Sequence, residues 1–259
     1  RVASRGLGDV YKRQILFILG IKMLGKESTA VKGNFLSAIA MLLAVLVTTL
    51  SLDINLLTIV VAILIGASVG SLIALKVKMT AIPEMVALFN GFGGLASFFI
   101  AWSQYSEPNI NLFQTVIVML TVYIGGLTFS GSLIAYGKLA EKIKLGKGSL
   151  LTNIFISAFY LSLLMLVFVL IDPVFFNFLD NQPTLFYVFL SFTILAGLGF
   201  VLPIGGGDMP VVISLLNSLS GIAAAFAGLL LLNNVLIVAG SLVGACLLYT
   251  SPSPRDATL

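Results

Sequence analysis

Three long apolar segments of the chain carry amide and hydroxyl side chains at helical spacing. The three sets are Asn90, Gly94 and Ser97; Thr121, Gly125, Thr128 and Ser132; and Ser214, Asn217, Ser218, Gly221 and Gly228. An unpaired polar group inside hydrocarbon is costly, so each set needs a partner. Such side chains can hold a short chain of waters that lines a path through the membrane, or they can hydrogen-bond between packed helices.

The most polar members of the three sets are expected at similar depth. Counted from the predicted inner end of each segment at 1.5 Å per residue, Asn90 and Ser132 lie about 9 Å deep and Asn217 about 14 Å deep. All three fall in the inner half of a hydrocarbon core about 30 Å thick. The shared depth suits a hydrated path, but hydrogen bonds that only pack helices together, worth about 0.6 kcal/mol each, are the reading that the residues alone favour.

Two carboxylates stand at the inner ends of these segments. Glu84 follows Pro83, and Asp208 precedes Met209 and Pro210. Carboxylates at the start of a helix interact with its free N–H groups and with the positive end of its dipole. Guarding the inner mouth of a polar path is a second role, and it is compatible with the first.

The residues before Asp208 are Gly205, Gly206 and Gly207. The Gly-Lys-Ser/Thr of a phosphate-binding loop does not follow them, so we expect a turn of unusual backbone freedom on the inner face, placed to couple the membrane segments to a cytoplasmic partner. The sequence holds no histidine and a single cysteine, Cys246. We therefore expect no catalytic residue, no bound cofactor and no metal site here.

Composition sets the fold class. Hydrophobic residues make up 59% and charged residues 9%, against about 25% charged in soluble domains. We predict an all-α, polytopic transmembrane bundle of about nine helices, with the first and last truncated. The expected spans are 15–24, 35–51, 54–75, 84–103, 112–137, 150–171, 185–203, 209–232 and 234–248. Two GxxxG pairs, Gly66/Gly70 and Gly240/Gly244, indicate close helix packing.

Both ends of the chain differ in composition from the rest. Residues 1–14 and 247–259 are predicted to be non-native sequence, which leaves 15–246 as the transmembrane domain of a fragment. These ends hold most of the excess positive charge, so the net charge of +4 indicates no nucleic-acid partner.

Lysines set the orientation. Every lysine between residues 15 and 246 falls on alternate connections, at 22–32, 76–78 and 138–147. By the positive-inside rule these connections are cytoplasmic. The N-terminus is then outside, and the glycine turn and the C-terminus are cytoplasmic.

Four runs of sequence resemble one family. They are MTAIPEMVAL at 79–88, TFSGSLIAYGKL at 128–139, GGDMPVV leading to LLNS at 206–218, and NNVLIVAGSLVGA at 233–245. They resemble the beta subunit of proton-translocating nicotinamide nucleotide transhydrogenase, over essentially all of 15–245.

The resemblance implies a multi-pass protein of the bacterial plasma membrane. It implies proton conduction coupled to hydride transfer between NAD(H) and NADP(H), within a complex. The NADP(H) domain follows the membrane domain in this family, and NAD(H) binds the alpha subunit. The expected partners are therefore the alpha subunit or subunits, the lipid bilayer and a second alpha–beta unit in a homodimer. This fragment alone lacks the hydride-transfer sites.

The family's proton path falls on Asn90, Ser132 and Asn217. Many members carry a titratable histidine where this chain has Asn90. We expect a partner-subunit helix to supply the proton carrier; Glu84, Asp208 and ordered water are the alternative. A self-contained secondary transporter is a different reading, but it needs an internal repeat and a charged or broken helix centre, and we find neither. A purely structural membrane subunit is a third.

Overall fold

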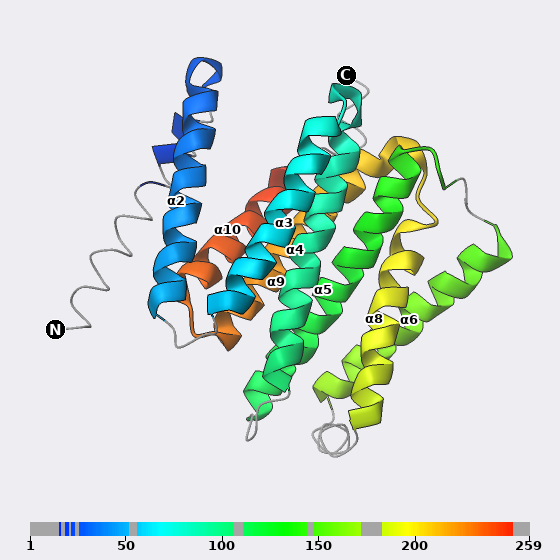
Figure 1. Ribbon diagram of the computed structural model, residues 1–259. Coiled ribbons are helices and arrows are strands. Elements are labelled where there is room, and N and C mark those ends of the chain that lie inside the picture. Colours follow the sequence, from blue (N-terminus) through cyan, green and yellow to red (C-terminus); the bar gives the residue numbers. More distant parts are fainter. Residues whose placement is uncertain are drawn as a thin grey trace. The chain divides into compact units, whose positions relative to one another are not determined.

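The computed structural model describes residues 26–51, 56–105, 111–143, 148–171 and 183–250, together with residues 16, 19, 20, 22 and 23. These residues form eight α-helices and no strand, so the all-α prediction is confirmed for them. The helices are α2 (Ala30–Ser51), α3 (Leu56–Lys76), α4 (Ile82–Tyr105), α5 (Leu112–Leu139), α6 (Leu150–Ile171), α8 (Pro183–Val201), α9 (Met209–Leu230) and α10 (Asn234–Thr250) (Figure 1).

The helices coincide with the predicted spans from 35–51 onward, within a few residues at each end. Half of the predicted span at 15–24, and most of the predicted foreign ends, lie outside the described residues. Five of the described helical segments are long and apolar enough to cross a membrane. The chain is a membrane protein, as its composition predicts.

The chain divides into two compact units, residues 1–76 and 77–259. Helices α2 and α3 belong to the first unit. On α3, Gly66 and Gly70 face open space, where an added Cβ would meet nothing within 4 Å. The close packing predicted for this GxxxG pair is therefore not formed among the described residues of the first unit.

Helix α5 is the central helix of the second unit. It packs against α4, α8 and α9, and more lightly against α6 (Figure 1). Its start is fixed by a capping box, in which Asn111 and Gln114 each accept a hydrogen bond from the other's backbone N–H. Residues far apart on α5, such as Thr115 and Lys138, are both buried.

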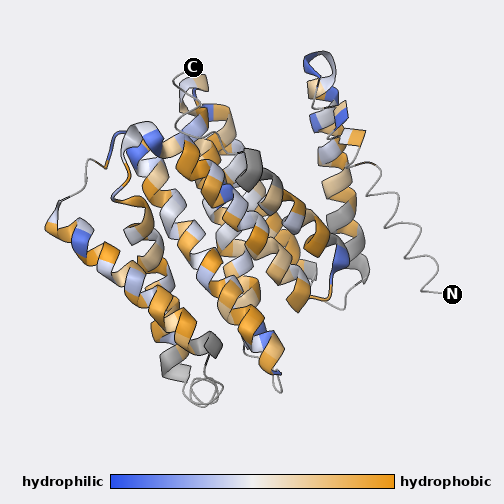
Figure 2. Ribbon diagram, turned by 180° about the vertical axis from the view of Figure 1, so that it is seen from behind, coloured by the Kyte–Doolittle hydropathy of each residue, from blue (hydrophilic) through white to orange (hydrophobic). Residues whose placement is uncertain are grey.

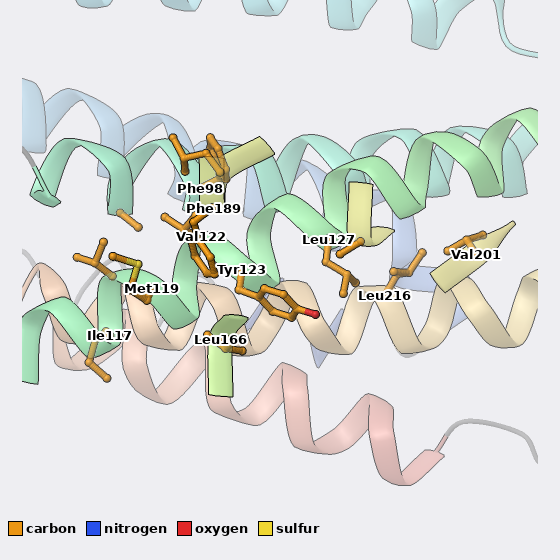
Figure 3. Packing of buried hydrophobic residues seen from close by; sticks show 14 of the residues in the cluster. Phe98, Ile117, Met119, Val122, Tyr123, Leu127, Leu166, Phe189, Val201 and Leu216 are labelled. Carbon is orange, nitrogen blue, oxygen red and sulfur yellow. The ribbon is translucent and has the colours of Figure 1, made fainter. Parts of the chain in front are cut away.

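Large apolar side chains of α5 fill the contacts with its neighbours. Val118, Met119 and Val122 are fully buried, and Figure 3 shows Met119, Val122, Leu127 and Leu216 within the same apolar cluster. Away from this cluster the helices present hydrophobic residues along their whole length, while hydrophilic residues gather near helix ends and turns (Figure 2). An apolar outer surface of this kind is what a lipid environment requires.

Glycines bring two helix pairs into close contact. An added Cβ on Gly94 of α4 would lie 2.9 Å from the carbonyl oxygen of Gly125 on α5. On α9, a Cβ at Gly221 would lie 2.6 Å from the Gly244 nitrogen and 2.9 Å from the Gly240 oxygen on α10. The packing role predicted for Gly240/Gly244 is confirmed.

Candidate functional site

An amide and a hydroxyl meet between α4 and α5. The Asn90 Nδ2 donates a hydrogen bond of 3.1 Å to the Ser132 Oγ. Asn90 is half-buried and Ser132 is fully buried. The two helices are antiparallel, because Gly91 faces Ser132 while Gly94, one turn later, faces Thr128. This geometry brings together two of the three residues that depth alone placed in one layer.

The third member of the cluster comes from α9, and it is Ser220. Its Oγ donates to the Asn90 Oδ1 at 2.7 Å. The amide of Asn90 therefore donates to α5 and accepts from α9, and it ties three helices together. We call Asn90, Ser132 and Ser220 the amide–hydroxyl cluster.

Sequence reasoning missed Ser220. The predicted polar stripe on this helix follows Ser214 at spacings of three, four and seven residues. Ser220 does not fall at any of these spacings. The signal that could have found it is its position three residues after Asn217, on a neighbouring line of the same helix surface.

Asn217 lies close to the cluster but outside it. It is half-buried, and no hydrogen bond to its side chain is formed among the described residues. It precedes Ser220 by about 4.5 Å along the axis, rotated by about 60° around it. Asn217 thus lies between the line of α9 that faces Asn90 and the line that faces α10.

Several other members of the predicted polar stripes serve packing or their own helix. Ser97 and Thr121 donate to the carbonyls of Gly93 and Ile117, four residues earlier, at 3.4 and 2.6 Å. Ser218 donates at 2.6 Å to the Gly244 carbonyl on α10. For these side chains the packing alternative describes what the structure contains.

Thr128 behaves differently. It lies one turn from Ser132 on α5 and is fully buried. Its Oγ1 has no hydrogen-bond partner in the described part of the protein. A buried hydroxyl without a partner is costly, and a water molecule is the ligand that commonly satisfies such a group.

The two carboxylates stand at the same end of parallel helices. Glu84 lies in the first turn of α4, half-buried. Asp208 is the exposed N-cap residue of α9, and its side chain caps no backbone N–H. Neither carboxylate touches the amide–hydroxyl cluster, which lies two to three turns further along these helices.

The glycine turn does not use the conformations that only glycine reaches. Gly205 is extended, with φ −68 and ψ 157, and Gly206–Asp208 form a short 3-10 helix. All three glycines are exposed, and an added Cβ on Gly206 or Gly207 would meet nothing within 4 Å. The observed turn therefore does not explain why three glycines stand here.

Lys138 differs from its predicted place in the connection after the fifth span. Helix α5 continues to Leu139, so Lys138 lies in its last turn, where it is buried. Its Nζ donates to the backbone carbonyls of Val201 at 3.3 Å, Leu202 at 2.5 Å and Ile204. The negative end of the α8 dipole and the carbonyl lone pairs left free at its last turn favour a cation here, although the Val201 carbonyl also accepts from the Ile204 N–H.

The chemistry of this arrangement is that of hydrogen-bond relay and not of covalent catalysis. Asparagine and serine side chains can orient water and pass hydrogen bonds along, but they do not titrate near neutral pH. Among the described residues no three His, Cys, Asp or Glu side chains lie close enough to hold a metal ion.

Comparison with known proteins places these helices in a family. The profile of the NAD(P) transhydrogenase beta subunit matches residues 10–251, which includes a few residues of each predicted foreign end. An NAD(P) transhydrogenase subunit beta from Rhodospirillum rubrum is 36% identical over 241 residues, which is 89% of this chain and 51% of that protein. A subunit of the same name from a defined strain of that organism matches equally.

The chain thus spans about half the length of the curated relatives it matches. The family match covers every helix that positions the amide–hydroxyl cluster and the glycine turn. The chain belongs to the NAD(P) transhydrogenase beta subunit family.

Proposed function

We propose that residues 15–246 form the membrane domain that conducts protons for an NAD(P) transhydrogenase. The observation that carries the proposal is the Asn90 amide, which donates to Ser132 and accepts from Ser220. Three helices thereby share a polar contact inside the bundle, beside its apolar core. A polar network inside a membrane bundle is a default candidate for an ion path.

The path extends from this cluster in two directions. Toward the cytoplasm, Asn217 and then the helix starts with Glu84 and Asp208 offer polar groups. Toward the outside, the buried Thr128 hydroxyl has capacity for a water molecule. We assign Asn90, Ser132 and Asn217 to the proton path, with Ser220 as the residue that fixes the Asn90 amide.

A titratable group must come from elsewhere, because Asn90 does not exchange protons near neutral pH. We propose that a helix of the alpha subunit supplies it beside the cluster. The cytoplasmic glycine turn, Gly205–Gly207, then links the membrane path to the nucleotide domain. Its exposure, and the room around each Cα, suit a surface on which another domain slides or docks.

In the complete complex this domain would couple proton movement to hydride transfer between NAD(H), bound by the alpha subunit, and NADP(H), bound by a domain of the beta subunit. We propose that the complex is a dimer of alpha–beta units in the bacterial plasma membrane. The N-terminal end of this domain would face outward and its C-terminal end the cytoplasm, because the lysines lie on that side.

The test uses the complete subunit, co-expressed with its alpha subunit in inverted membrane vesicles. NADPH-dependent reduction of an NAD analogue is followed together with a pH-sensitive dye. Hydride transfer with matching proton movement supports the proposal. Hydride transfer without proton movement would overturn it for this domain, and the asparagine at position 90 would be the first suspect.

A further inference from the structure

Lys138 is a buried cation whose counterpart is backbone and not a carboxylate. It is 8% exposed, and each of its three N–H bonds has one carbonyl partner, on Val201, Leu202 and Ile204. Among the described residues no carboxylate forms an ion pair with it. A buried charge that loses such partners is destabilising, so the contact fixes the geometry of both sides.

The three carbonyls lie where α8 ends and the chain turns toward α9. Val201 is the last residue of α8, and Ile204 directly precedes Gly205. Three donors on one side chain can bind three carbonyls that converge where a helix ends. Lys138 therefore holds the backbone from the last residue of α8 to the residue before the first glycine.

Beyond Ile204 the hydrogen bonds of Lys138 end, and the turn is held by its own bond from the Asp208 N–H to the Gly205 carbonyl. Gly206 and Gly207 are exposed, and an added Cβ on either would meet nothing within 4 Å. The segment that Lys138 holds directly ends at Ile204, and α9 begins at Met209. A movement of the glycine turn would thus pivot about a point attached to α5.

Helix α5 also carries Ser132, two turns before Lys138. The same helix therefore contacts the amide–hydroxyl cluster through Ser132 and the glycine turn through Lys138. We propose that Lys138 is a positioning residue, which anchors the glycine turn to α5 so that changes at the cluster reach the cytoplasmic face. The effect on coupling rests on the proposed function, whereas the contact between Lys138 and the glycine turn can be tested by itself.

The anchor is tested by a spin label at position 206, using G206C in the complete complex without other reactive cysteines. Position 206 is exposed and spacious, so the label itself should not disturb the turn. Lys138→Met keeps the length of the side chain and removes its charge. We expect the label to become several-fold more mobile in Lys138→Met, and to regain most of its order in Lys138→Arg.

Lys142→Met is the matched control. Lys142 lies just beyond the same helix and is exposed, with its Nζ 5.5 Å from the Tyr136 ring and no backbone carbonyl bound. We expect its label mobility to equal that of the parent. If the Lys138→Met complex does not accumulate, Lys138→Gln, which keeps a hydrogen-bond donor, replaces it. We then expect a smaller increase in label mobility.

Coupling is measured in the same variants as protons moved per hydride transferred. We expect this ratio to fall at least threefold in Lys138→Met and to stay unchanged in Lys142→Met. An immobile label in Lys138→Met would overturn the anchor. A mobile label with an unchanged ratio would overturn its role in coupling. A parent complex that moves no protons would instead defeat the proposed function, while the label still decides the anchor.

Discussion

Ser220 donates a 2.7 Å hydrogen bond to the side chain of Asn90, although 130 residues separate them in the sequence. This bond holds the Asn90 amide from the α9 side. With its Oδ1 occupied by α9, the amide directs its Nδ2 toward Ser132 on α5. Without Ser220 the amide would lose this constraint, because an asparagine side chain can exchange its donor and acceptor ends by rotation.

Ser220→Ala is therefore expected to lower proton-coupled hydride transfer several-fold. It leaves the half-buried Asn90 Oδ1 without its acceptor bond, at a cost of about 1 kcal/mol in stability. Coupled rates in vesicles and thermal unfolding in detergent are the measurements, and Ser220→Thr should restore most of the rate.

The control for this variant is Ser157→Ala. Ser157 is exposed on α6 and donates to the Asn153 carbonyl of its own helix at 3.0 Å. It should leave both rate and stability unchanged. Equal rates in Ser220→Ala and the parent would show that the orientation of the Asn90 amide has no bearing on coupling.

Thr128→Val separates a hydrated path from packing. Valine has the shape of threonine, and the Thr128 hydroxyl is buried without a protein partner. If the side chain only packs, removing the hydroxyl should be neutral or stabilising. The proposed path predicts instead a several-fold loss of coupled turnover with unchanged or higher thermal stability, and a parental rate would exclude Thr128 from the path.

Asn217→Leu should block proton-coupled turnover while membrane insertion and expression stay normal. Asn217 is half-buried and donates to no described residue, so a leucine costs no protein hydrogen bond. The measurement is the coupled rate per inserted complex. Asn153→Leu, at an exposed position of α6, serves as the control. Parental coupled rates in Asn217→Leu would remove this residue from the path.

The sequence predicted the helices well because their signal is local. Long apolar runs and the helix-start residues before α9 each act within one segment, and the structure has these elements within a few residues. The alternation of lysines between connections predicts which helix ends are cytoplasmic, and that orientation stays a prediction. Asn90 and Ser132 could be paired by depth, because both lie at equal distances from their helix ends.

Rotation about the helix axis could not be predicted in the same way. Depth selected Asn217, but the rotation of α9 turns Ser220 toward Asn90 and Ser218 toward α10. That rotation is set by the close contact of Gly221 with Gly240 and Gly244, which is a property of two helices together. The burial of Lys138 could not be predicted either, because its partners are backbone carbonyls and these carry no signal in the sequence.

Two neighbouring glycines on α4 test how closely the cluster depends on helix packing. A Cβ at Gly94 would lie 2.9 Å from the Gly125 oxygen and 3.0 Å from the Thr128 Cβ, whereas a Cβ at Gly93 would meet nothing within 4 Å. Gly94→Ala should therefore force α4 and α5 apart, at a cost of about 1–3 kcal/mol. Because Asn90 lies one turn away, its bond to Ser132 should lengthen and coupled turnover should fall.

Gly93→Ala makes the same chemical change on the open face of the same helix. It should be neutral or slightly stabilising, because alanine favours the helix by about 1 kcal/mol over glycine. Thermal unfolding and coupled rates of the two variants are compared side by side. Equal behaviour would mean that α4 and α5 are not held at the close distance on which the contact between Asn90 and Ser132 depends.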